Sequence, residues 1–169
     1  MAGDYLLHGA KGWGSVVVEA ALVLMGQAYR TVDLPQGVYA HDDQELARVN
    51  PLRQVPALVL PSGELLTESA AILLWLTEQH PEAGLAPAPG APERGEFLRW
   101  MAYVPGQIYP MYWVRDVPSR LAEGEAAEAV IKTRTAERIA DCWAMMESQI
   151  SPGGGSIRLH QRWPRWSGG

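Results

Sequence analysis

The sequence predicts an α/β domain with a mixed β-sheet, followed by a short all-α domain. Three observations predict this architecture. Strand-like and helix-like segments alternate up to residue 80 in the order β-α-β-α-β-β-α, a proline-rich run follows at residues 81–92, and only helical spacing recurs in residues 93–150. We therefore expect one domain over residues 4–80, a stiff linker over 81–92 and a second domain over 93–150.

The chain is predicted to begin with a βαβ unit. A short strand, Tyr5–His8, is followed by the glycine-punctuated loop GAKGWG, and a helix then runs from an N-cap at Ser15 to a stop at Gly26. The apolar residues of this helix recur at helical spacing, at Val18, Leu22 and Met25. The segment AYRTVDL, residues 28–34, reads as the second strand. Such a unit favours parallel pairing with a right-handed crossover.

The next segments predict a short helix, a hairpin and a longer helix. QELARVN, residues 44–50, is helical and ends before Pro51. PALVL and LLT, residues 56–60 and 65–67, are strands joined by the turn PSGE, so they form an antiparallel hairpin and make the sheet mixed. The helix that follows has Ser69 as its N-cap, with Ile72, Leu73 and Leu76 on its apolar side.

Beyond the linker the sequence is helical. The helix in ERGEFLRWMAYV meets Pro105 and Pro110, which we expect to kink or break it. A longer helix over residues 125–150 places one apolar stripe at intervals of three or four residues, formed by Ile131, Thr135, Ile139, Cys142, Met146 and Ile150. We therefore expect Cys142 to lie in the core rather than to act as a nucleophile.

Composition excludes several classes of function. The 169 residues are 47% hydrophobic and 20% charged, which is typical of a globular chain, and the net charge of −5 argues against a nucleic-acid partner. No basic, apolar leader begins the chain and no apolar run reaches the about 20 residues of a membrane span, so we expect a cytoplasmic protein without a membrane partner. One cysteine and four scattered histidines predict no metal site.

The last segment, residues 151–169, differs from the rest of the chain. It contains three consecutive glycines, then three arginines and two tryptophans, and no acidic residue. Because it has no apolar periodicity, we predict a disordered or non-native end. The alternative is a basic, aromatic arm for an acidic partner.

A candidate ligand site surrounds the predicted hairpin. Pro56 begins its strand, and if the Val55–Pro56 bond is cis, the Val55 N–H and C=O face outward and can pair with another peptide. The helix that opens at Ser69 offers N–H groups to an anion, and Glu68 can accept from an ammonium group. A ligand with a peptide-like middle and a zwitterionic end suits this surface. Each residue also has an ordinary structural interpretation: Pro56 as the first residue of a strand, Ser69 as a helix cap and Glu68 as a surface acid.

The motifs NPLRQVPALVL and LTESAAILLWL, at this separation and before a proline-rich linker and helices, resemble the cytosolic glutathione S-transferase family. The resemblance is to the bacterial type that does not use a cysteine, and it implies a thioredoxin-like first domain with a cis proline. It implies that Val55 and Pro56 meet the cysteinyl part of glutathione. It also implies that Glu68 and Ser69 hold the γ-glutamyl end, and that Arg53 or Gln54 lies toward the glycine end. Glutathione is then the co-substrate.

Activation of the glutathione thiol requires a group near the end of the first strand. The loop GAKGWGS offers neither cysteine nor tyrosine, so Ser15 is the candidate catalytic residue and Lys11 adds positive charge. Ser15 is equally an ordinary N-cap. We expect the electrophile to rest against aromatic residues of the helical part, namely Tyr103, Tyr109, Tyr112 and Trp113.

Three functions stay open at this point. The resemblance implies a homodimeric transferase that conjugates glutathione to a small hydrophobic electrophile. A glutathione-binding or interaction module without turnover is the first alternative. The second is a truncated, inactive paralogue, because nothing in residues 151–169 matches the further helices of the family.

Overall fold

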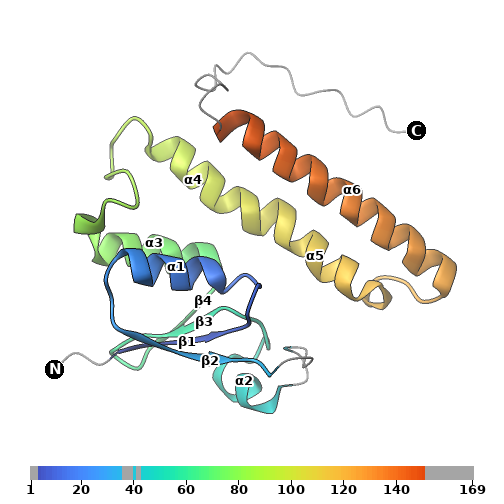
Figure 1. Ribbon diagram of the computed structural model, residues 1–169, viewed down its shortest axis with the longest axis horizontal. Helices are drawn as coiled ribbons and strands as arrows, with labels where there is room; N and C mark the ends of the chain where they lie inside the picture. The colour runs from blue at the N-terminus through green and yellow to red at the C-terminus, as the bar shows by residue number, and fades with distance from the viewer. Residues whose placement is uncertain (1–3, 36–39, 41–42, 151–169) are drawn as a thin grey trace. The chain divides into compact units, whose positions relative to one another are not determined.

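The computed structural model describes residues 4–35, 40 and 43–150 (Figure 1). The chain divides into two compact units, Met1–Pro105 and Gly106–Gly169. The expected helix between the linker and Pro105 thus belongs to the first unit. The tail at 151–169 lies outside the described residues.

The first unit contains the predicted order of strands and helices. Its elements are β1 (Tyr5–Gly9), α1 (Val16–Leu24), β2 (Tyr29–Asp33), α2 (Gln44–Val49), β3 (Ala57–Val59), β4 (Leu65–Thr67), α3 (Ser69–Gln79) and α4 (Arg94–Tyr103). The sheet order is β2-β1-β3-β4, with β1 and β2 parallel and the other two pairs antiparallel. The mixed sheet and the thioredoxin-like fold class are confirmed.

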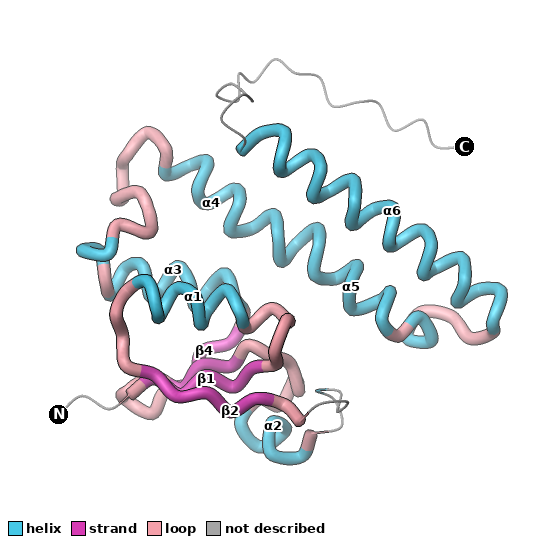
Figure 2. Tube along the Cα trace, in the orientation of Figure 1, coloured by secondary structure: helices cyan, strands magenta, loops and turns pink. Residues whose placement is uncertain are grey.

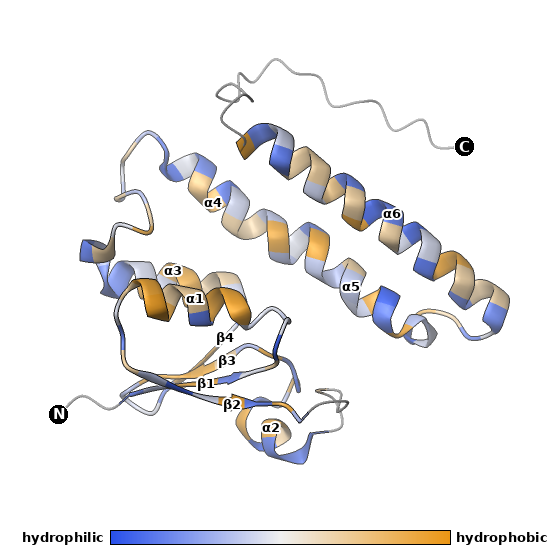
Figure 3. Cartoon of the chain, in the orientation of Figure 1, coloured by the Kyte–Doolittle hydropathy of each residue, from blue (hydrophilic) through white to orange (hydrophobic). Residues whose placement is uncertain are grey.

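Helices cover both faces of this sheet. The helices α1 and α3 lie on one face and α2 lies on the other (Figures 1 and 2). The core forms between the sheet and the α1–α3 layer, where Leu7 and Leu58 from the strands meet Leu22 and Ile72 from the helices, each at most 1% exposed. Figure 3 shows the apolar residues that α1 contributes. Burial of such side chains contributes about 1.5–3 kcal/mol each to the stability of the unit.

The two predicted serine caps have different outcomes. Ser15 is the N-cap position of α1, as predicted, but its side chain makes no capping hydrogen bond to the helix. Glu68, not Ser69, is the N-cap position of α3, and its side chain makes no cap bond either. A side-chain cap does occur at α2, where the Asp43 carboxylate accepts from the Leu46 N–H at 2.7 Å. Both serines are instead buried, at 4% and 7% exposure.

The linker and the proline-interrupted helix contain local structure. A 3₁₀ turn occupies Pro81–Ala83, so the predicted linker is not wholly irregular. After α4, a π-helical turn at Val104–Ile108 contains Pro105 and replaces the regular hydrogen-bond pattern, which confirms the predicted interruption. No helix among the described residues has the length and apolar content of a membrane span.

The second unit is a helical pair, α5 (Tyr109–Asp116) and α6 (Glu125–Ile150), with a 3₁₀ turn at Pro118–Arg120 between them. Thr135, Ile139 and Cys142 are the buried residues of α6, so the core position of Cys142 is confirmed. The predicted stripe does not extend to the end of the helix, because Ile150 is 53% exposed. Spacing along a helix defines a face, but burial requires a neighbour along its whole length.

Candidate functional site

Strand register gathers three loops at one edge of the sheet. His8 pairs with Ala57 and Ala57 pairs with Thr67, both antiparallel. The residues after β1, before β3 and after β4 therefore emerge at the same edge. The expected residues Lys11, Val55 and Glu68 belong to these three loops. The topology thus brings together segments that lie far apart in the sequence.

The loop before β3 holds Val55 in a half-buried position. The Val55–Pro56 peptide bond is cis, as the resemblance implied. Within the part of the chain that the structure describes, no residue hydrogen-bonds to the Val55 backbone. Its N–H and C=O are therefore available to a ligand peptide.

Asn50 organises this loop, and sequence reasoning missed its role. Its side-chain amide donates to the Gln54 carbonyl at 2.9 Å and its side-chain oxygen accepts from the Leu52 N–H at 3.1 Å. Its own carbonyl accepts from the Arg53 N–H at 2.8 Å, and Asn50 is only 2% exposed. An asparagine at a helix end before a proline is a signal for such a loop-forming side chain.

The loop before α3 places Glu68 in an unusual conformation. Glu68 has φ of 66°, and Arg53, on the neighbouring loop, has φ of 52°; they are the only non-glycine residues with positive φ in the described part of the chain. A backbone conformation of this kind costs a non-glycine residue about 1–3 kcal/mol, and residues strained in this way concentrate at ligand sites. The exposed Glu68 carboxylate forms no ion pair with another described residue. It is therefore free to meet a cation.

The start of α3 offers hydrogen-bond donors beside Glu68. The first bond of the helix runs from the Ile72 N–H to the Glu68 carbonyl, which leaves the N–H groups of residues 69–71 ahead of the helical ladder. The Ser69 hydroxyl makes no hydrogen bond to another described residue although Ser69 is 7% exposed. Glu68 and Ser69 together can hold an ammonium and a carboxylate on one ligand end.

Ser15 closes the loop after β1. Its hydroxyl donates to the Ala10 carbonyl at 3.1 Å and accepts from the Ala10 N–H at 3.0 Å. The same side chain packs on Gly9, where an added Cβ would lie 2.8 Å from the Ser15 Oγ. Since its one proton is committed to Ala10, Ser15 holds the loop closed. The exposed Lys11 lies in this loop.

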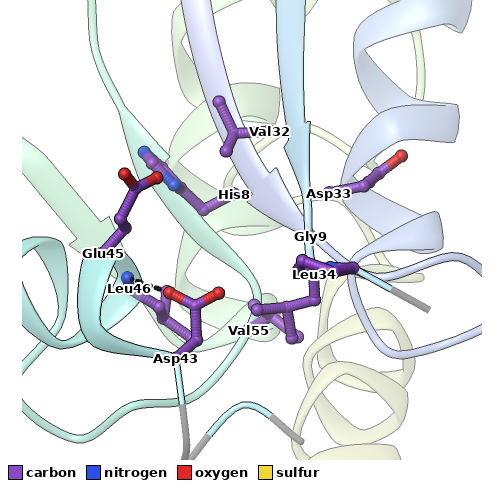
Figure 4. A pocket seen from close by; sticks show the side chains of 10 residues that line it. His8, Gly9, Val32, Asp33, Leu34, Asp43, Glu45, Leu46 and Val55 are labelled. Carbon is purple, nitrogen blue, oxygen red and sulfur yellow. Dashed lines mark hydrogen bonds between the residues drawn. The ribbon is translucent and has the colours of Figure 1, made fainter. Parts of the chain in front are cut away.

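A cavity of about 110 Å³ lies beside Val55 and is lined by residues of β1, of β2 and the segment after it, and of the start of α2 (Figure 4). Its polar lining is His8 from β1 with Asp43 and Glu45 at the start of α2, and Figure 4 shows Glu45 directed toward His8. Burial lowers the pKa of His8, while the charges of Asp43 and Glu45 act in the opposite direction. Among the described residues, no group of three or more histidine, cysteine or acidic side chains is placed to hold a metal ion.

The expected electrophile-binding residues do not form one described cluster. Tyr109, Tyr112 and Trp113 lie on α5, whereas Tyr103 ends α4 in the first unit and packs edge-on against Trp100 at 5.4 Å. Guanidinium groups cover the rings of Tyr112 and Trp113, from Arg115 at 4.6 Å and Arg120 at 4.3 Å. Burial, then the neighbouring Tyr112, raises the pKa of Tyr109. Their role with an electrophile stays a prediction.

Comparison with known proteins agrees with this arrangement. The family model for the glutathione S-transferase N-terminal domain matches residues 15–84. The uncharacterized GST-like protein YncG of Escherichia coli K12 is 33% identical over 146 residues, which covers 86% of this chain and 69% of YncG. This chain belongs to the glutathione S-transferase family. The resemblance stated from the motifs is therefore confirmed.

Other relatives of this chain differ in their named activities. A maleylacetoacetate isomerase of Rhizobium meliloti is 37% identical over 114 residues, 65% of this chain and 52% of the isomerase. A glutathione transferase homologue from Sulfitobacter, solved with bound glutathione, superposes with a TM-score of 0.80 at 25% identity, over 90% of this chain and 73% of that one. A sphingomonad glutathione S-transferase complexed with glutathione superposes with a TM-score of 0.68 at 30% identity. This superposition covers 85% of this chain and 69% of the other. Family membership therefore leaves the reaction of this chain to be proposed.

Proposed function

We propose that this protein binds glutathione at the edge of the sheet and transfers its thiolate to a small hydrophobic electrophile. The observation that carries the proposal is the juxtaposition, through the β1–β3–β4 register, of the unpaired Val55 backbone with Glu68 and the start of α3. The glutathione found in the two solved relatives supports the choice of ligand.

Each part of glutathione has a complementary group. The cysteinyl backbone pairs with the N–H and C=O of Val55, next to Pro56, as an added strand would. The γ-glutamyl ammonium pairs with the Glu68 carboxylate, and its carboxylate accepts from Ser69 and the neighbouring N–H groups. Arg53 and Gln54 lie in the same loop as Val55, on the side of the glycine end.

Conjugation requires the thiol to ionise. A thiol with a pKa near about 8.5 is mostly protonated at neutral pH, so positive potential near the sulfur raises the reactive fraction. We propose that Lys11 and backbone N–H groups of the loop after β1 supply this potential, with Ser15 holding the loop in position. The proton leaves to solvent, and the sulfur electron pair then forms the carbon–sulfur bond to the electrophile. In a substitution, the carbon's bond to its leaving group breaks and the group departs as an anion. In an addition to an activated double bond, the displaced π pair takes a proton from solvent.

The residues proposed to receive the electrophile lie in both units, and each unit is considered by itself. Tyr103 of the first unit, and Tyr109, Tyr112 and Trp113 of the second, each offer aromatic surface suited to a small apolar molecule. We propose a role in detoxification of such electrophiles, in the cytoplasm.

A conjugation assay beside calorimetry tests the proposed function. We expect glutathione to bind with a Kd in the millimolar range or tighter, and a generic aromatic electrophile to be conjugated faster than in a protein-free control. Absence of glutathione binding by folded protein at millimolar concentration would overturn the ligand assignment. Binding without conjugation, tested over several electrophile classes, would instead identify a binding module.

The binding module is the second candidate because of one observation. The Ser15 hydroxyl is engaged with Ala10 on both its donor and acceptor sides, so it has no proton to offer a thiolate. If Lys11 and the loop N–H groups give too little potential, glutathione binds and its thiol stays protonated. The inactive-paralogue alternative concerns residues 151–169, outside the described part of the chain.

We also expect a homodimer formed through the first unit. The β4 leucines, Leu65 and Leu66, are only half-buried, α4 has no buried residue, and Leu98 on α4 is 41% exposed. Burying these apolar groups against a second copy would stabilise the two subunits of the dimer.

Light scattering should give twice the chain mass, and the substitution Leu98→Arg should shift the protein toward the monomer. Leu121→Arg, in the second unit and 64% exposed, is the matched control; a monomeric folded wild type at high concentration would refute the dimer.

A further inference from the structure

The cavity beside Val55 lies where the third residue of bound glutathione should point. With the γ-glutamyl end at Glu68 and the cysteinyl part at Val55, the peptide runs from the β4 side of the sheet toward β1 and β2. The cavity lies at that side, because its lining includes Val55 itself, Gly9 at the end of β1 and Leu34 just after β2. This placement rests on the proposed function.

The charge of the cavity does not suit a free glycine carboxylate. Asp43 and Glu45 line it, and His8 is the only titratable base among the described lining residues. Because its pKa lies below the ordinary value, His8 is largely uncharged at neutral pH. Asp33 also borders the cavity, with its carboxylate directed away from His8 (Figure 4). The described lining therefore carries more negative than positive charge, which disfavours an anion there.

Arg53 is absent from the described lining of the cavity. The apolar part of the wall, formed by Val32, Leu34 and Leu46, suits a short hydrocarbon chain. A volume of about 110 Å³ has room for roughly four groups of water size, at about 30 Å³ each. A short aminoalkyl chain has this size, with methylene groups for the apolar wall and an ammonium for the two carboxylates.

We propose that the site prefers glutathione whose glycine carboxylate is masked as an amide bearing a short aminoalkyl group. The amide removes the repelled negative charge, and the ammonium at its end pairs with Asp43 and Glu45 beside His8. The aminoalkyl glutathione amide is then the ligand class of this protein, and free glutathione is its weaker analogue.

Competitive calorimetry with three synthetic probes tests this preference: glutathione, its glycine amide and its glycine N-(2-aminoethyl) amide. The aminoethyl amide should bind at least about tenfold more tightly than glutathione, with the simple amide between them, since two carboxylates favour the added cation and disfavour the anion. In the double variant Asp43→Asn, Glu45→Gln this ratio should fall to about two or less. Asparagine keeps the acceptor that caps α2 at the Leu46 N–H, so the helix is retained.

Glu64→Gln, in the turn between β3 and β4 and away from the cavity lining, is the matched control and should keep the full ratio. Equal affinity for all three probes, or tighter binding of glutathione, would overturn the inference and place the glycine carboxylate on Arg53 instead. A preference that survives in the double variant would overturn it as well, because the carboxylates would not be its cause. Failure of every probe to bind would refute the proposed function and this inference with it.

Discussion

Replacing Glu68 by alanine is expected to raise the Kd for glutathione by about 10- to 150-fold. The change removes a charged hydrogen bond to the ligand ammonium, which contributes about 1.5–3 kcal/mol. Glu68 suits this role because its carboxylate meets no described partner and because the chain holds it at φ of 66°, just before α3. Isothermal calorimetry on the folded variant measures the loss.

Two further substitutions test whether the charge of Glu68 causes the loss of glutathione affinity. Glu68→Gln keeps an acceptor and loses the charge, so its Kd should fall between wild type and Glu68→Ala. Glu64→Ala removes an exposed acid from the turn at the other end of β4 and should leave the Kd unchanged. If Glu68→Ala binds glutathione as tightly as the Glu64 variant, Glu68 does not contact the ligand and its strained backbone needs another explanation.

Replacing Ser15 by alanine is expected to destabilise the first unit by about 1–3 kcal/mol. The buried Ala10 N–H would lose its partner, whereas the Ala10 carbonyl keeps its bond from the Trp13 N–H, and an unsatisfied buried group costs about this amount. Chemical denaturation monitored by the fluorescence of the tryptophans measures the change. Ser62→Ala, at an exposed turn where the hydroxyl accepts only a 3.4 Å bond from the Glu64 N–H, should change stability by less than about 0.5 kcal/mol.

The pH–rate profile of the same variant decides whether Ser15 is catalytic. A positioning residue leaves the apparent pKa of the glutathione thiol where it was, although turnover falls as the loop loosens. A serine that donates to the sulfur would raise that pKa when removed, because the thiolate would lose its donor. A raised pKa with unchanged stability would contradict the positioning role and restore Ser15 as the catalytic group.

The sequence by itself determined the elements of the first unit and their order. Helical spacing at Val18 and Leu22, the stop at Gly26 and the turn between two short apolar runs are local signals, so they can be read from neighbouring residues. The motif around Pro56 is also a local signal, because a proline restricts where its strand can begin. The family followed from two such motifs at a fixed separation.

The tertiary structure alone decided what individual side chains do. Ser15 and Ser69 both precede helical sequence and look alike as caps, yet one bonds to Ala10 across a loop and the other begins its helix beside a ligand surface. Asn50 ties the Val55 loop together, and His8 meets Glu45 only because β1 and α2 come together in the folded sheet. Hydrogen-bond partners and charge environments depend on residues distant in the chain, and only strand register and helix packing bring those residues within reach.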